Sequence, residues 1–187
     1  MSGKVFFWLL ATVFLITARS TEAQQAKRVP RIGVLVAVSP AVVAARIDAL
    51  RQGLRELGYI DGQNILIEPR YGEGKLDRLP ALARQLVGLK VDIIVSAGGQ
   101  ATRAAREATS TIPIVMTNDP DPVGSGFVAS LARPGGNVTG LFTLAPELSG
   151  KRLELLREVV PKLSRVAIIG TSTQAGHAQT IKELELT

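Results

Sequence analysis

The fold is decided by residues 91–108, which read VDIIVSAGGQATRAAREA. Val91 to Val95 is rich in β-branched residues and therefore predicts a strand. A glycine-rich loop, Ser96 to Gln100, follows, and the alanine-rich segment that ends near Ala108 has the composition of a helix. A strand, a polar loop and a helix in this order form one repeat of a parallel α/β sheet.

The same order recurs on both sides of this stretch. The apolar run from Arg31 to Val38 predicts a strand buried on both faces. Ser39 is the expected N-cap of the next helix, with Pro40 at its first position and Gly58 at its C-terminal end. Further strands are predicted at 64–68, 113–116 and 138–142, and further helices at 76–89 and 123–133.

Five strand-to-helix units predict a three-layer α/β sandwich with a parallel sheet. Pro69 closes the second strand and fits an edge position, where a missing N–H is tolerated. Right-handed crossovers then give the flavodoxin-like strand order 2-1-3-4-5. In the turn at 134–136 we expect a positive φ at Gly136.

The pattern changes after Thr143. Residues 147–160 predict a helix, and Arg165 to Ile169 predict a sixth strand, which is followed by the loop Thr171 to Gln174. This strand either joins the first sheet or opens a second domain.

The first 23 residues are typical of a secretory signal peptide. Lys4 precedes an apolar run from Val5 to Ile16, and small residues suited to cleavage end at Ala23. The apolar run is shorter than the roughly 20 residues of a membrane-spanning helix, although an uncleaved anchor is the alternative. We therefore expect export to the periplasm, a flexible mature N-terminus at 24–30, and a mature chain that is not embedded in the membrane.

Composition narrows the possible functions. The chain has no cysteine, which excludes a disulfide scaffold and any cysteine-based metal site or nucleophile. The formal net charge is +6, but the basic residues, among them Arg46, Arg51 and Arg55, are scattered where a helix would turn them toward water. They do not interleave with aromatic residues, so we expect no nucleic-acid partner.

Loops that follow the strands of a parallel sheet converge at one edge, which is where open α/β sheets bind ligands. Ser39, the loop 96–102 and the loop 117–121 fall at this edge. Helix N-termini with glycines suit a carboxylate or another small anion, and Asn118 and Asp119 could pair with an amine or a hydroxyl. The alternative is that Ser39 and Asp121 are helix caps and the glycines merely form a tight turn.

No enzyme signature is present in the sequence. The loop after the first strand lacks the GxGxxG pattern of a dinucleotide site, and there is no P-loop. The single histidine, His177, has no cysteine near it and favours a surface position. Asp119 and Asp121 could form a metal pair, but no third ligand lies nearby in the sequence. We therefore predict no catalytic residue, no metal and no cofactor, with an unrecognised α/β enzyme as the weakest alternative.

Several segments resemble those of the substrate-binding proteins of ABC transporters, in the group that includes tryptophan- and tyrosine-type amino-acid binders. The most specific is RPGGNVTG at residues 133–140, within the matching segment SLARPGGNVTG at 130–140. The others are LGYIDGQN (57–64), IEPRY (67–71), VDIIV (91–95), TIPIV (111–115), DPV (121–123) and KRLELL (151–156).

The resemblance implies a periplasmic two-lobed protein that closes over a small solute, such as an amino acid or a similar organic anion, and presents it to an ABC permease in the inner membrane. It implies an N-terminal lobe at 31–143, with a hinge crossover and an incomplete second lobe at 144–187. A ligand-sensing domain that signals to a receptor or kinase is the alternative function. The implied ligand-binding residues are Ser39, Gly98, Gly99, Gln100, Ala101, Thr102, Asn118 and Asp119.

Overall fold

The structure is a computed structural model that describes residues 28–143, 148–170 and 177–185. The predicted signal peptide, the first four residues of the predicted hinge crossover (144–147) and the loop Thr171 to Gln174 lie outside the described residues. The elements are β1 (Arg31–Val36), α2 (Pro40–Glu56), β2 (Leu66–Tyr71), the 3₁₀ turn η1 (Leu76–Arg78), α3 (Leu79–Gly88), β3 (Ile93–Ala97), α4 (Gly99–Ala108), β4 (Ile114–Asp119), β5 (Val138–Phe142), α5 (Leu148–Val159) and α6 (His177–Glu185).

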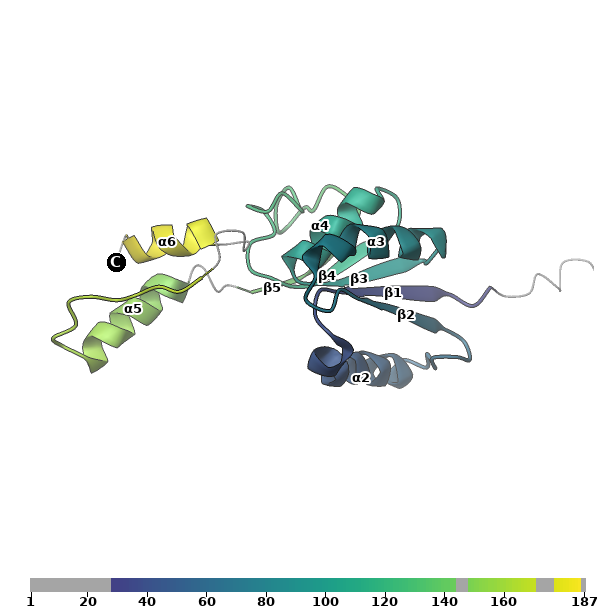
Figure 1. Ribbon diagram of the computed structural model, residues 1–187, viewed down its shortest axis with the longest axis horizontal. Helices are drawn as coiled ribbons and strands as arrows, with labels where there is room; N and C mark the ends of the chain where they lie inside the picture. Colours follow the sequence, from purple (N-terminus) through teal and green to yellow (C-terminus); the bar gives the residue numbers. More distant parts are fainter. Residues whose placement is uncertain (1–27, 144–147, 171–176, 186–187) are drawn as a thin grey trace, which may run out of the picture.

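The five strands form one sheet in the order β2-β1-β3-β4-β5, and all four pairings are parallel. Helix α2 lies on one face of the sheet, and α3 and α4 lie on the other (Figure 1). The predicted three-layer architecture and strand order are confirmed. Pro69 sits within the edge strand β2, opposite Val34 of β1, as its missing N–H requires.

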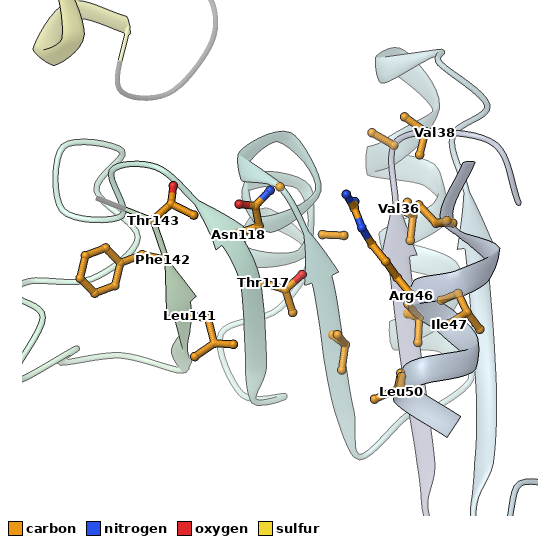
Figure 2. A pocket seen from close by; sticks show the side chains of 16 residues that line it. Val36, Val38, Arg46, Ile47, Leu50, Thr117, Asn118, Leu141, Phe142 and Thr143 are labelled. Carbon is orange, nitrogen blue, oxygen red and sulfur yellow. The ribbon is translucent and has the colours of Figure 1, made fainter. Parts of the chain in front are cut away.

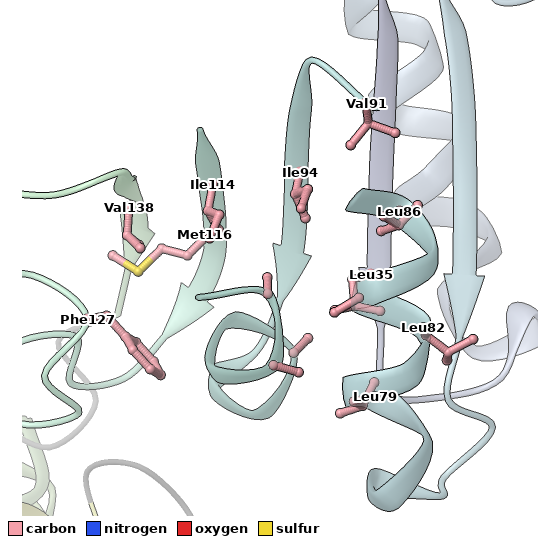
Figure 3. Close-up of a cluster of buried hydrophobic side chains, with 14 of the residues drawn as sticks. Leu35, Leu79, Leu82, Leu86, Val91, Ile94, Ile114, Met116, Phe127 and Val138 are labelled. Carbon is pink, nitrogen blue, oxygen red and sulfur yellow. The ribbon is translucent and has the colours of Figure 1, made fainter. Parts of the chain in front are cut away.

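The main core lies between the sheet and the helices α3 and α4 (Figure 3). Leu35, Ile94 and Ile114 of three neighbouring strands and Leu86 of α3 are all fully buried there. Burying an aliphatic side chain of this size stabilises a fold by about 1.5–3 kcal/mol. This face therefore carries most of the hydrophobic stabilisation.

A smaller cluster lies on the opposite face, where Val43 and Ile47 of α2 pack on Val34 and Val36 of β1. Helix α2 ends as predicted. The N–H of Gly58 donates to the carbonyl of Arg55 (2.9 Å) and that of Tyr59 to the carbonyl of Leu54 (2.8 Å), as in a Schellman motif. The helix start is also at the predicted place, with Ser39 as the N-cap and Pro40 as the first helical residue, although the Ser39 side chain makes no capping hydrogen bond.

The predicted helix at 123–133 is wrong, since the structure has turns there. The Asp121 carboxylate accepts a hydrogen bond from the Gly124 N–H (2.7 Å), and Gly126 adopts a φ of 71°. Glycine has poor helix propensity, and an aspartate that bonds two or three residues ahead stabilises a turn. The positive φ in the following turn belongs to Gly135 (76°) and not to Gly136.

The predicted sixth strand is also wrong, because residues 165–169 pair with no strand of the part of the chain that the structure describes. Val166, Ile168 and Ile169 are exposed, so this apolar run has no neighbouring sheet to pack on. The helix predicted at 147–160 is present as α5. It contacts α6, and the two lie beyond β5 in Figure 1.

Among the described residues, none of the helices combines the length and hydropathy needed to cross a membrane.

Candidate ligand-binding site

A groove of about 670 Å³ opens beside α2 and runs along the sheet to its carboxyl edge (Figure 2). Its floor is apolar, and its polar groups are gathered where the strands end. The residues that line it are Val34, Val36, Ala37, Val38, Val43, Arg46, Ile47, Leu50, Val95, Ala97, Gly98, Thr117, Asn118, Leu141, Phe142 and Thr143.

The groove exists because α2 covers only part of its face of the sheet. Val34 of β1 lies beneath the helix and is 2% exposed, whereas Leu141 of β5, at the far end of the groove, is 71% exposed. The strands between them contribute half-buried side chains, among them Val95 and Thr117. The result is an apolar surface accessible to a small molecule, which is typical of ligand sites.

A bulge in β4 places Asn118 in the groove. The pairing of β4 with β5 shifts register between Met116 and Asp119, and Asn118 within this bulge has a φ of 62°. Few non-glycine residues adopt this conformation, and asparagine is among those that do so at lowest cost. The bulge breaks the alternation of the strand, so that Asn118 lines the groove while Asp119 is fully buried.

Asp119 is fully buried in the protein interior and does not line the groove. One oxygen, Oδ1, accepts the N–H of Asp121 (2.9 Å), whereas Oδ2 is buried without a hydrogen-bond partner. Burial raises the pKa of Asp119 above its ordinary value, the hydrogen bond from Asp121 lowers it, the charge of Asp121 raises it and that of Arg103 lowers it. Its backbone carbonyl accepts the N–H of Thr143 (2.9 Å), which ties the end of β5 to this loop.

Two buried hydroxyls hold the start of α4 against β3. Ser96 and Thr102 are fully buried, and their oxygens lie 2.8 Å apart. Thr102 Oγ1 also donates to the carbonyl of Gly98 (3.2 Å), whose φ of 85° allows the sharp turn from strand to helix. Thr102 therefore holds the loop between β3 and α4 in place through its buried hydroxyl group.

The predicted ligand loops all lie at the carboxyl edge of neighbouring strands, since Ser39 follows β1, Gly99 follows β3 and Asn118 is the last residue but one of β4. The groove itself brings together Gly98 and Asn118 from the predicted set. Ser39, Gly99, Gln100, Ala101, Thr102 and Asp119 are not among its lining residues. Ligand binding by these eight residues stays a prediction.

The sequence pattern missed Arg46 and Thr143 as lining residues, and it placed Thr117 in the loop 117–121 without naming it among the ligand-binding residues. Arg46 has the spacing of a solvent-facing residue and is indeed exposed, but it borders the groove because Ile47 next to it is buried against the sheet. Thr117 lies in the second half of β4 and Thr143 directly follows β5, and the strand bounds decide whether such side chains reach this face. Because β4 extends to Asp119 and not to Met116 as predicted, Thr117 falls within the strand.

Within the described residues, no three His, Cys, Asp or Glu side chains are grouped closely enough to hold a metal ion. The carboxylates of Asp119 and Asp121 each accept a backbone N–H, from Asp121 and Gly124 respectively.

The sheet order and the groove at its carboxyl edge are those of the periplasmic-binding-protein-like α/β fold. Residues 31–187 match the model of a family described as ABC transporter substrate binding protein, and the chain belongs to this family. A similar curated protein is the tyrosine-binding protein of Clostridioides difficile (strain R20291), which is 33% identical over 144 residues. The match covers 74% of this chain and 41% of that protein.

Two solved structures are similar to the chain. One is a conserved domain protein from Vibrio cholerae O1 biovar El Tor (TM-score 0.77, 31% identity). The match covers 85% of this chain and 53% of the Vibrio chain. The other is an ABC domain in complex with L-Trp from Streptococcus pneumonia (TM-score 0.74, 27% identity). The match covers 84% of this chain and 52% of the Streptococcus chain. The chain thus spans about half the length of these relatives.

Proposed function

We propose that this chain supplies one lobe of a periplasmic solute-binding component of an ABC importer. Residues 31–143 would form the ligand-binding lobe, and 144–187 would lead into a second lobe. Residues 1–23 would direct export. The solute would be passed to an ABC permease in the inner membrane. The family match supports the class, and the five-stranded sheet with its groove supports the ligand-binding lobe.

The observation that carries this proposal is the groove at the carboxyl edge of the sheet. It offers an apolar floor for the body of a small molecule and a polar end formed by Gly98, Thr117, Asn118 and Thr143. One relative is named for tyrosine binding, and another is solved with L-Trp. An apolar groove with a polar end suits molecules of this kind, so an amino acid is the proposed solute.

Isothermal titration calorimetry of the full chain with L-Trp and L-Tyr tests the proposal. A single lobe excludes water from only one side of the ligand, so we expect dissociation constants nearer 1 mM than 1 μM, which correspond to about 4 and 8 kcal/mol. Asn118→Ala should weaken binding about tenfold, because its amide borders the groove.

Gln52→Ala provides a matched control. Gln52 is an exposed amide side chain on α2 that pairs with Glu56 and does not line the groove. Its loss should leave the affinity unchanged. Absence of heat and of thermal stabilisation with every standard amino acid at millimolar concentration would contradict the proposed function.

A further inference from the structure

The groove carries a single charged side chain. Among the residues that line it, Arg46 is the one ionisable group, and no carboxylate borders this space in the described part of the chain. The positive charge is therefore not neutralised within the groove. An uncompensated charge beside apolar walls attracts an anion more strongly than it would in open solvent, because the neighbouring low-dielectric surface screens it less.

Arg46 differs from the next arginine of the same helix. Arg51 is held by Asp48 and by Asp61, each at 3.3 Å. Within the described residues, the side chain of Arg46 makes neither a hydrogen bond nor an ion pair with a protein group. Figure 2 shows its side chain extending from α2 across the groove toward the strand that carries Thr117 and Asn118.

The backbone of Arg46 is fixed although its guanidinium is free. Val43 and Ile47, three positions before it and one after it, are 2% and 6% exposed and anchor this turn of α2 to the sheet. The guanidinium can therefore reach the groove from a rigid support, and binding would order only the side chain. Preorganisation of this kind reduces the entropy lost on binding.

We propose that Arg46 binds the carboxylate of the amino-acid solute and thereby selects acids over derivatives that lack this group. This inference rests on the proposed function and names the residue that gives the site this selectivity. Guanidinium and carboxylate groups match in shape and form two parallel hydrogen bonds. With the carboxylate on Arg46, Asn118 and Thr117 stand on the other side of the groove to bind a second polar group.

The test compares acids with their amides, in which an uncharged carboxamide replaces the carboxylate. Full-chain protein is titrated with L-Trp and L-Tyr and with L-tryptophanamide and L-tyrosinamide, which keep the side chain and the amine but lack the carboxylate. The acids should bind at least tenfold more tightly, a difference of about 1.4 kcal/mol. In Arg46→Met, which keeps most of the apolar stem, the preference for the acid should disappear, and Arg46→Lys should recover part of it.

Arg55→Met is the matched control. Arg55 lies on the same helix, is exposed and does not line the groove, and its substitution changes the net charge by the same amount. It should keep the preference for the acid within twofold. The affinity of the unsubstituted chain for the acids should also fall as salt is raised, and that of Arg46→Met should not.

The outcomes separate this inference from the function on which it rests. If the acids and the amides bind equally well, or if Arg46→Met retains the preference, the chain is a solute-binding lobe and the role of Arg46 is wrong. If neither the acids nor the amides bind, the proposed function fails, and the role of Arg46 falls with it. Equal weakening by Arg46→Met and Arg55→Met would show a general charge effect and would overturn the specific contact.

Discussion

The two faces of the sheet differ in how completely they are covered. On the α3 and α4 side, side chains from four strands and two helices form one continuous core, in which Leu35, Leu86 and Ile94 have no solvent exposure. On the α2 side, the buried cluster comprises two residues of β1 and two of α2. The first face has little free surface to offer a ligand, whereas the second leaves an apolar floor beside a helix.

This difference indicates that the α3 and α4 face of the sheet mainly stabilises the fold, whereas the α2 face is available for binding. A core packed to crystal-like density loses several kcal/mol when a side chain is cut back, whereas a half-exposed surface relaxes into solvent. Substitutions on the two faces should therefore separate into those that unfold the chain and those that change what it binds.

The largest loss of stability is expected at the pairing of β4 with β5, because both faces of the sheet depend on this pairing. Gly140 of β5 has a φ of 141°, and a Cβ built there would lie 2.0 Å from the carbonyl oxygen of Met116 in β4. Gly140→Ala must push the two strands apart, so we expect a loss of about 3 kcal/mol or more of unfolding free energy, or failure to fold. Urea denaturation followed by circular dichroism measures it.

Gly136→Ala is the control for this substitution, because a Cβ there would have no neighbour within 4 Å and the φ is not positive. It should change stability by less than about 0.5 kcal/mol. A Gly140→Ala chain as stable as Gly136→Ala would show that β4 and β5 are not paired as described.

The two faces can be compared directly with one leucine from each. Leu86 of α3 is fully buried in the main core, whereas Leu50 of α2 borders the groove and is half-buried. Both lie in helices, so Leu→Ala changes helix propensity equally. We expect Leu86→Ala to cost about 3 kcal/mol and Leu50→Ala about 1 kcal/mol, measured by urea denaturation. Equal losses would mean that the α2 face is as tightly packed as the other.

The core could be predicted from the sequence because its signals are local. The apolar run of β1, the spacing of Leu79, Leu82 and Leu86 in α3 and the glycine-rich loop before α4 can each be read from a few neighbouring residues. Their parallel arrangement then leaves little choice of strand order. The predicted fifth strand matches β5 at both ends.

The groove could not be predicted in the same way, because it forms where α2 leaves part of the sheet uncovered. Whether Arg46 faces bulk water or an apolar hollow is decided by β3 and β4, which lie some 50 to 70 positions later in the sequence. The bulge at Asn118 is likewise a property of strand pairing, and the residue pattern does not indicate it. The turns at 123–126 were predicted as the start of a helix because aspartate and glycine next to an apolar segment fit both a helix start and a loop.

The smallest change in stability is expected at two adjacent residues of β4 that lie on different sides of the sheet. Asn118 borders the groove, whereas the neighbouring Asp119 is buried with its Oδ2 unpartnered. Because burial raises the pKa of Asp119, the folded chain binds this proton more tightly than the unfolded chain. Its contribution to stability is therefore greatest below the ordinary carboxyl pKa and is lost as the pH rises from that value through the raised pKa.

Asp119→Asn removes this titration and keeps an oxygen that can accept the Asp121 N–H. We expect the unfolding free energy near neutral pH to change by about 1 kcal/mol or less, because the weaker hydrogen bond to a neutral acceptor is offset by not burying a charge. Urea denaturation from pH 4 to pH 7 should show a smaller decline in stability than in the unsubstituted chain. Amino-acid affinity should be retained, since Asp119 does not line the groove. If affinity is lost while stability and its pH dependence stay unchanged, Asp119 contacts the solute directly, and the separation of the two faces breaks down at this residue.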